Sequence, residues 1–330
     1  MISQGVGRAS YSRPYPAIKY FAHAVWFLRD AQLEGNLFND YSAGNFLSYW
    51  LAPRMRVFVN GSLNVPRHVM TARQTIRQRG WQSDEAFADL LDRYGIDVFF
   101  GTGEPVMPDE NRPVISTTTH LEDTPGWILV FRNIRSAVYL RANERNRSNL
   151  ERVAAWYARE GVPFDPVRGF ETDRVLREAQ PWAIEHGLVP THLEQLEWAA
   201  HSLDPSLRPA AQERLASIYA ALGLYARAEA IDRRLLRSDP RSIPAARRLV
   251  WSLLHQGRSA ESLEAADRLA AIAPPGDGLS RMLIDTTRHR SAVSDGQAAA
   301  LVALLPVFTE SEGQWLRAGF REPEARLRRP

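Results

Sequence analysis

Residues 215–240 read LASIYAALGLYARAEAIDRRLLRSDP, and residues 249–274 read LVWSLLHQGRSAESLEAADRLAAIAP. The two stretches align without a gap at a separation of 34 residues, with leucine on leucine at 215 and 249 and glycine on glycine at 223 and 257. A fixed period of this length indicates stacked helical hairpins, in which each repeat covers the apolar face of its neighbour. We therefore predict an all-α helical repeat domain in this part of the chain.

The recurring residues suit the mechanics of such a hairpin. Ala216 and Ala228 let its two helices cross closely, Gly223 allows the tight turn between them, and Pro240 ends the second helix. In order and spacing this stretch resembles the tetratricopeptide-repeat family, and the residues that carry the resemblance are Leu215, Ala216, Tyr219, Gly223, Tyr225, Ala228, Leu235 and Pro240.

Two copies do not make a complete array, because about three repeats are needed to cover each apolar face. Upstream, Asp204-Pro205 echoes Asp239-Pro240 at a distance of 35 residues. Downstream, residues 279–289 and 297–308 have the spacing of a further helical pair. We predict that the tetratricopeptide-like array covers residues 171–308 and that a tail follows at 309–330.

The resemblance also implies a concave groove, lined by the first helix of each hairpin, that binds a protein or peptide partner. We expect Trp251 to be exposed beside Arg247 as an anchor for a peptide. Burial of Trp251 between repeats is the equally open alternative. By register with the family, the groove residues are Glu213, Ser217 and Ala220 in one repeat and Arg247, Trp251 and His255 in the next.

The N-terminal half alternates short apolar runs with segments of helical spacing, which predicts an α/β domain with a small, mostly parallel sheet over residues 15–141. Expected strands are 36–38, 56–59 and 96–100, followed by a hairpin of 127–131 and 137–140 around Asn133. Expected helices are 17–28, 43–51 and 84–94. A helical connection over 142–170 leads to the array.

Part of this half resembles the soluble extracytoplasmic tail of bacterial C-type membrane glycosyltransferases, which use polyprenol-phosphate sugars. The similarity is carried by Tyr15-Pro16, GNLFNDY at 35–41 and RVFVNG at 56–61, with a later run at 87–97. It implies a domain on the outer side of the membrane, beside a sugar-transferring enzyme or its glycan. The family has an aspartate and an arginine where this chain has Asn60 and Ser62, and its catalytic membrane helices have no counterpart here.

Ligands of parallel sheets bind beyond the carboxyl ends of the strands. This rule predicts a crevice, in which Asp40 and Glu104 form an acid–base pair if the fold brings them within reach. The alternatives are a plain turn at 100–104 and carboxylates that bond to backbone amides. The residues of the predicted crevice are Asn39, Asp40, Asn60, Gly61, Thr102 and Gly103.

Composition excludes several classes of function. The chain has no cysteine, and its formal net charge of +3 is too small to indicate nucleic acid. Its eight histidines are scattered without the spacing of metal ligands, so we predict neither a metal nor another cofactor. No stretch reaches the roughly 18 apolar residues that a transmembrane segment needs.

Three hypotheses follow. The first is an interaction protein of the tetratricopeptide type, accessory to cell-envelope glycosylation. The second is the detached soluble region of a membrane glycosyltransferase. The third is a soluble enzyme that uses the strand-end crevice.

Overall fold

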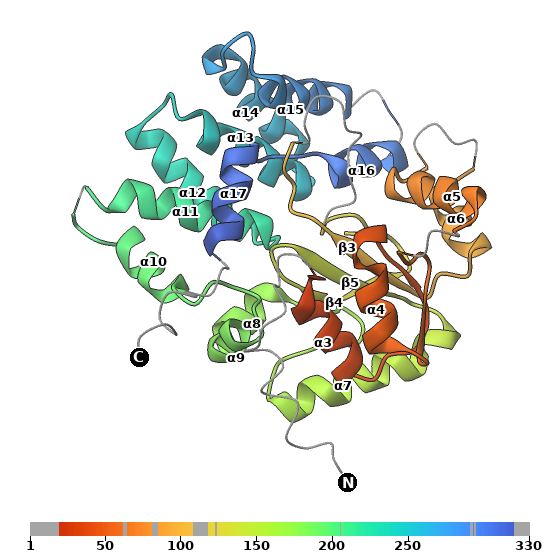
Figure 1. Cartoon of the computed structure of the whole chain (residues 1–330). Coiled ribbons are helices and arrows are strands. Elements are labelled where there is room, and N and C mark those ends of the chain that lie inside the picture. Colours follow the sequence, from red (N-terminus) through yellow and green to blue (C-terminus); the bar gives the residue numbers. More distant parts are fainter. Residues whose placement is uncertain are drawn as a thin grey trace. The chain divides into compact units, whose positions relative to one another are not determined.

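A computed structural model describes residues 20–61, 65–80, 85–107, 118–122, 124–204, 206–290, 293 and 295–319. The chain divides into two compact units (Figure 1). The first comprises residues 1–104 and 115–188, and the second comprises residues 105–114 and 189–330. Tyr15, Pro16 and Ser62 of the resembling motif lie outside the described residues, as does Asp84 at the start of a predicted helix.

The first unit contains a mixed five-stranded sheet with the strand order β2-β1-β3-β5-β4. Its strands are β1 (Gly35–Phe38), β2 (Met55–Val57), β3 (Val98–Thr102), β4 (Trp127–Arg132) and β5 (Ser136–Arg141). β1 pairs in parallel with β2 and β3, whereas β5 pairs antiparallel with β3 and β4. The predicted terminal hairpin is present, and it makes the sheet mixed rather than mostly parallel. Its tight turn is held by Asn133, whose side chain accepts from the amides of Arg135 and Ser136 at 3.0 and 2.8 Å.

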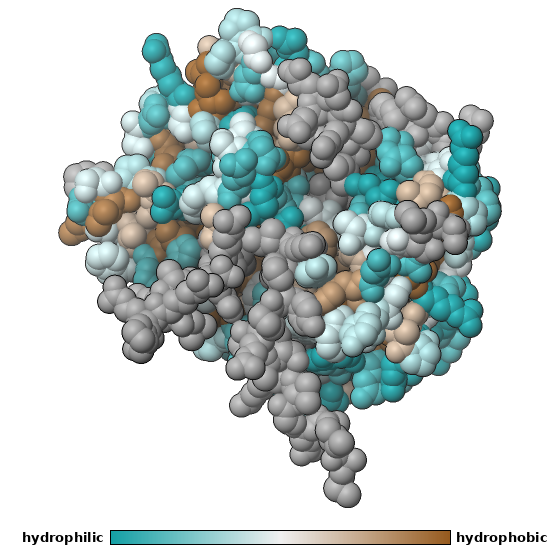
Figure 2. Space-filling view, in the orientation of Figure 1, coloured by the Kyte–Doolittle hydropathy of each residue, from teal (hydrophilic) through white to brown (hydrophobic). Residues whose placement is uncertain are grey.

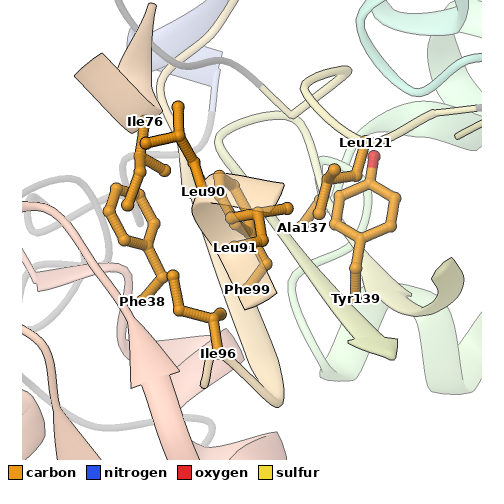
Figure 3. Close-up of a cluster of buried hydrophobic side chains, with 9 residues drawn as sticks. All are labelled: Phe38, Ile76, Leu90, Leu91, Ile96, Phe99, Leu121, Ala137 and Tyr139. Atoms are coloured by element: carbon orange, nitrogen blue, oxygen red, sulfur yellow. The ribbon is translucent and has the colours of Figure 1, made fainter. Parts of the chain in front are cut away.

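Helices cover both faces of this sheet, as the continuous burial along β3 and β5 requires, because successive side chains of a strand point to opposite faces. On one face, Ile76 of α5 (Arg67–Arg77) and Leu90 of α6 (Phe87–Arg93) pack with Phe38 and Phe99 from the strands (Figure 3). On the other face lie α3 (Ala22–Asp30), α4 (Gly44–Leu51), preceded by the short helix η1 (Tyr41–Ala43), and α7 (Arg147–Glu160), which follows η2 (Glu144–Asn146). There, the Phe27 ring stacks on Phe131 with centroids 5.1 Å apart.

Two short helices, α8 (Thr172–Glu178) and α9 (Gln180–Glu185), also belong to the first unit. Trp182 of α9 packs edge-on against Trp156 of α7 at 5.8 Å and stacks on His186 at 4.2 Å. The sequence places residues 171–188 in the repeat array, but this aromatic cluster holds them on the α/β unit.

The second unit is a helical array with a structural period of 34 residues. α11, α13 and α15 end at residues 221, 255 and 289, and α12 and α14 end at 238 and 272. The turns are equivalent too, since Gly223 and Gly257 both have positive φ, 78° and 70°. Its helices are α10 (Leu193–Ala200), α11 (Arg208–Ala221), α12 (Tyr225–Ser238), α13 (Ile243–His255), α14 (Ser259–Ile272), α15 (Gly278–His289), α16 (Asp295–Leu304) and α17 (Glu310–Gly319).

Residues one period apart occupy equivalent positions in the core. Leu215, Leu249 and Leu283 are all buried, as are Ala228 and its counterpart Ser262. The pattern read from the sequence is therefore a packing pattern, and the helical repeat architecture is confirmed. Within the described residues, no helix combines the length and apolar character needed to cross a bilayer.

Candidate functional site

The loops that follow β1 and β2 meet at one edge of the sheet. The buried Asn39 side chain accepts from the Phe58 amide at 3.0 Å and donates to the Val59 carbonyl at 2.8 Å. On α4, the Asn45 side chain accepts from the Gly61 amide at 2.8 Å. Both asparagines therefore hold the segment after β2 against the end of β1.

A close backbone contact tightens the same junction. A methyl group at Gly44 would lie 2.2 Å from the Val59 carbonyl oxygen and 2.6 Å from the Asn60 Cα. Glycine therefore lets α4 begin directly against the segment after β2. The structure thus brings Asn39, Asn60 and Gly61 together in a packed junction that belongs to the resembling motif.

Thr102 and Gly103, the other predicted crevice residues, pair with β5 and with the turn that precedes it. Thr102 pairs with Ser136 in the sheet, and the Gly103 amide donates to the Arg135 carbonyl at 2.8 Å. Glu104 forms an ion pair with the same arginine at 2.9 Å. Because β5 and β1 flank β3 on opposite sides, these contacts lie on the side of β3 away from the junction.

Asp40 is held by two arginines of α5. Its carboxylate lies 2.9 Å from Arg73 and 3.3 Å from Arg77. Burial raises the pKa of Asp40, but the charge of Arg77, the Ser42 amide and Arg73 together hold it below its usual value. Asp40 therefore stays ionised at neutral pH, and each carboxylate of the predicted acid–base pair has an arginine partner of its own.

A groove of about 590 Å³ lies between α5 and α6. Exposed Arg67 and His68 flank it together with Arg93, while the buried Ala72 and Leu90 contribute apolar surface. The two arginines beside an apolar floor suit an anionic ligand with an apolar body. This groove has no signal in the sequence, because its lining comes from two helices that only the tertiary fold brings together.

In the helical unit, the expected exposure of Trp251 is wrong, because its side chain is 0% exposed. The indole packs against Tyr225 and His255, and its N–H donates to the Leu305 carbonyl at 3.0 Å. Arg247 is buried beside it, and Ala220 is buried as well. Arg247, Trp251 and Ala220 are therefore interior positions, and Arg247 and Trp251 contact the chain's own C-terminal residues Glu312 and Leu305. Glu213 and His255 are partly buried.

Glu213 and Ser217 contact Arg248, a buried residue that the sequence does not single out. Arg248 Nη2 lies 2.6 Å from Asp232 Oδ1 and 3.0 Å from Glu213 Oε2, and its Nη1 lies 3.3 Å from the Ser217 hydroxyl. Burial lowers the pKa of Arg248, but Asp232 and Glu213 outweigh this and hold it above its usual value. A permanently charged guanidinium thus joins α11, α12 and α13.

Among the described residues of the helical unit, three large apolar side chains are exposed, namely Trp198 (69%), Leu203 (93%) and Leu207 (49%). We call them the α10–α11 edge. Hydrophobic surface lies over the turn between these helices, at the left of the view (Figure 2). The sequence signals this exposure through helical register, because Trp198 falls between Leu196 and Ala200, which with Leu193 are the buried positions of α10.

A second exposed surface, made of aromatic side chains, lies on α4. Phe46 and Trp50 are partly exposed and Tyr49 is 78% exposed, at the spacing of one helix face. We call these three residues the α4 aromatic stripe. The guanidinium of Arg29 lies 5.8 Å from the Trp50 ring. Aromatic rings beside a cation suit amphipathic partners, which have both apolar and polar surface.

His120 is a buried histidine of the first unit. Its ring stacks on Phe99 at 4.9 Å, and its Nε2 lies 3.1 Å from the Ile76 carbonyl. Burial and then the charge of Arg79 lower the pKa of His120 well below its ordinary value of 6.5. The ring is therefore neutral, and Nε2–H is the donor to Ile76.

We expect this histidine to make the first unit less stable in acid. Below pH 6.5 the unfolded chain binds a proton at this histidine that the folded chain does not bind. The contribution of His120 to the free energy of unfolding is therefore fully present above pH 6.5 and falls by up to about 1.4 kcal/mol per pH unit below it. Urea denaturation at pH 7.5, 6.0 and 5.0 measures the loss. His120→Gln should flatten this dependence, whereas His68→Gln, at an exposed position of α5, should keep it.

Comparisons of the chain with protein-family models, curated proteins and solved structures find no match in any of the three. Groups of three or more metal-ligating side chains are also not found in the part of the chain that the structure describes. The functional assignment therefore depends on the geometry of the two units.

Proposed function

We propose that this protein is an interaction protein of the tetratricopeptide type, and that the α10–α11 edge of its helical unit contacts a protein partner. The observation that carries this proposal is the exposure of Trp198, Leu203 and Leu207 in an array whose recurring apolar positions are otherwise buried. The 34-residue period of helix ends and turns supports the tetratricopeptide class.

Exposed side chains of this size favour association. Burying a large apolar side chain contributes about 1.5–3 kcal/mol, and tryptophan is enriched among the residues that dominate binding energy at interfaces. Trp198 is well placed to be such an anchor because it projects from a regular helix, with two flexible leucine side chains close by in sequence. A partner with a complementary apolar pocket is the expected ligand.

Capture of partners from the source cells tests the proposal. The Trp198→Ala/Leu203→Ala chain should recover the principal partner at least about 10-fold less than wild type, as expected for loss of a binding anchor. Its unfolding temperature should change little, because these side chains are exposed in the free protein. Tyr49→Ala is the matched control, since it removes an equally exposed aromatic from the other unit. Equal recovery by all three chains would show that the edge is not a contact surface.

A second candidate function places the first unit beside a membrane glycosyltransferase or its glycan, in cell-envelope glycosylation. It is favoured by the α4 aromatic stripe, which lies within the motif that resembles the glycosyltransferase tail. Loss of the partner with Tyr49→Ala, but not with Trp198→Ala/Leu203→Ala, would support this candidate instead. Translating the DNA upstream of Met1 tests the version in which the chain is a detached tail, because in-frame apolar spans would then be present.

A further inference from the structure

Residues 305–312, which we call the C-terminal strap, cross the inner face of the helical unit. Leu305, Val307 and Phe308 are all buried, with 4%, 1% and 0% of their surface exposed. The Trp251 indole N–H donates to the Leu305 carbonyl at 3.0 Å. The strap thus covers Arg247 and Trp251, two positions that the repeat register assigns to a ligand, and its last three residues begin α17 (Figure 1).

The strap is held through its backbone, as an added strand is held by a sheet edge. The amides of Val307 and Phe308 donate to the Pro105 carbonyl at 2.8 and 3.0 Å, and the Met107 amide donates to the Phe308 carbonyl at 2.8 Å. Val106 and Phe308 form a parallel bridge. These backbone bonds do not depend on the strap's side chains, so any extended segment of the right shape can make them.

The acidic end of the strap binds Arg247. Glu312 accepts from the Thr309 amide at 2.6 Å, which caps the start of α17, and its two oxygens lie 3.1 and 3.2 Å from Arg247 Nη2. Arg247 Nε is buried and has no hydrogen-bond partner among the residues that the structure describes. A single nitrogen therefore serves both carboxylate oxygens, whereas an arginine and a carboxylate pair best through two parallel N–H···O bonds.

We propose that this inner face is a peptide-binding site which the strap occupies as an intramolecular ligand. Its partner is a protein segment with an extended apolar run, an aromatic residue at the place of the buried Phe308, and a helical turn that carries a carboxylate for Arg247 four residues further on. A carboxylate free of the capping role can engage Nε and Nη2 together, which gives the partner an advantage over the strap. This site is separate from the α10–α11 edge proposed above, and its test uses a different ligand and different variants.

Occupation by the strap sets the affinity for the partner. When only a fraction of the molecules has an open site, the apparent Kd is the intrinsic Kd divided by that fraction. Weakening the strap raises this fraction without changing the site. The partner segment should therefore bind more tightly to a chain whose strap is weakened than to the wild type.

The experiment uses a fluorescent peptide with the sequence of residues 303–314, ALLPVFTESEGQ, and the full chain. By fluorescence anisotropy, we expect the peptide to bind the Phe308→Ala chain at least about 10-fold more tightly than wild type. A peptide with alanine in place of its phenylalanine should bind neither chain. Adding Arg247→Ala to Phe308→Ala should abolish the gain.

Equal binding of the peptide to wild type and to folded Phe308→Ala chain would overturn the proposal. Hydrogen exchange on the wild type provides a second test that needs no variant. The Val307 and Phe308 amides should exchange through a local opening, faster than the core amides of α13. If they exchange only with global unfolding, the strap is a fixed part of the core and the proposal fails.

Discussion

Replacing Arg248 with alanine should lower the free energy of unfolding of the helical unit by about 3–5 kcal/mol, the usual cost of breaking a buried ion pair from one side. Arg248 and Asp232 have 1% and 0% of their side chains exposed. Asp232 Oδ1 accepts two hydrogen bonds from Arg248, and its buried Oδ2 has no hydrogen-bond partner in the described part of the chain. Without the guanidinium, a buried carboxylate is left with no counter-charge, because its remaining neighbour Glu213 is also acidic.

The pH dependence of this loss identifies its cause. Burial raises the pKa of Asp232, and Arg248 opposes the rise, so removing Arg248 raises the pKa further. A group whose pKa is higher in the folded state than in the unfolded state stabilises the fold at low pH and loses that contribution as pH rises. The deficit of Arg248→Ala, measured by urea denaturation with circular dichroism, should therefore shrink between pH 8 and pH 5.

Two further variants serve as controls for Arg248→Ala. Arg268→Ala breaks an ion pair with Glu264 that is mostly exposed, and it should change stability little. Arg248→Ala/Asp232→Ala removes both charges and should recover part of the loss. A deficit of Arg248→Ala that is small and independent of pH would contradict the buried ion pair.

The helical unit was predictable because its determinants are local. Gly223 and Gly257 mark the turns, and the recurring apolar residues specify which helix faces pack, so one period of sequence predicts one hairpin of structure. The strands of the α/β unit were also predictable as short apolar runs. The mixed arrangement of the strands was not predictable. The antiparallel direction in which β5 joins β3 depends on long-range pairs such as Val98 with Leu140.

The candidate site was less predictable, for the same physical reason. Register identified Arg247 and Trp251 as inner-face residues, but their partners Glu312 and Leu305 stand more than fifty residues further along the chain. No periodic pattern connects positions so distant. The partners of Asp40 were hidden in the same way, because Arg73 belongs to a helix beyond the next strand.

Trp251→Ala should be the other severe change, with a loss of about 3–5 kcal/mol in the free energy of unfolding of the helical unit. The indole is fully buried, and its ring lies 5.3 Å from that of Tyr225 and 4.2 Å from that of His255. Alanine leaves a cavity between α12 and α13 and removes the donor to the Leu305 carbonyl. Urea denaturation followed by circular dichroism measures the loss.

Trp251→Phe separates the contribution of ring packing from that of the hydrogen bond to the Leu305 carbonyl. It keeps most of the aromatic volume but has no N–H, so the loss should be smaller and should include about 1–3 kcal/mol for a buried carbonyl left without its donor. Because that carbonyl belongs to the strap, amide exchange at Val307 and Phe308 should accelerate more than exchange in the distant helix α10. Equal acceleration throughout the unit would mean that the indole stabilises only the packing of the helices. Acceleration confined to the strap would mean that this one hydrogen bond helps to determine how often the inner face opens.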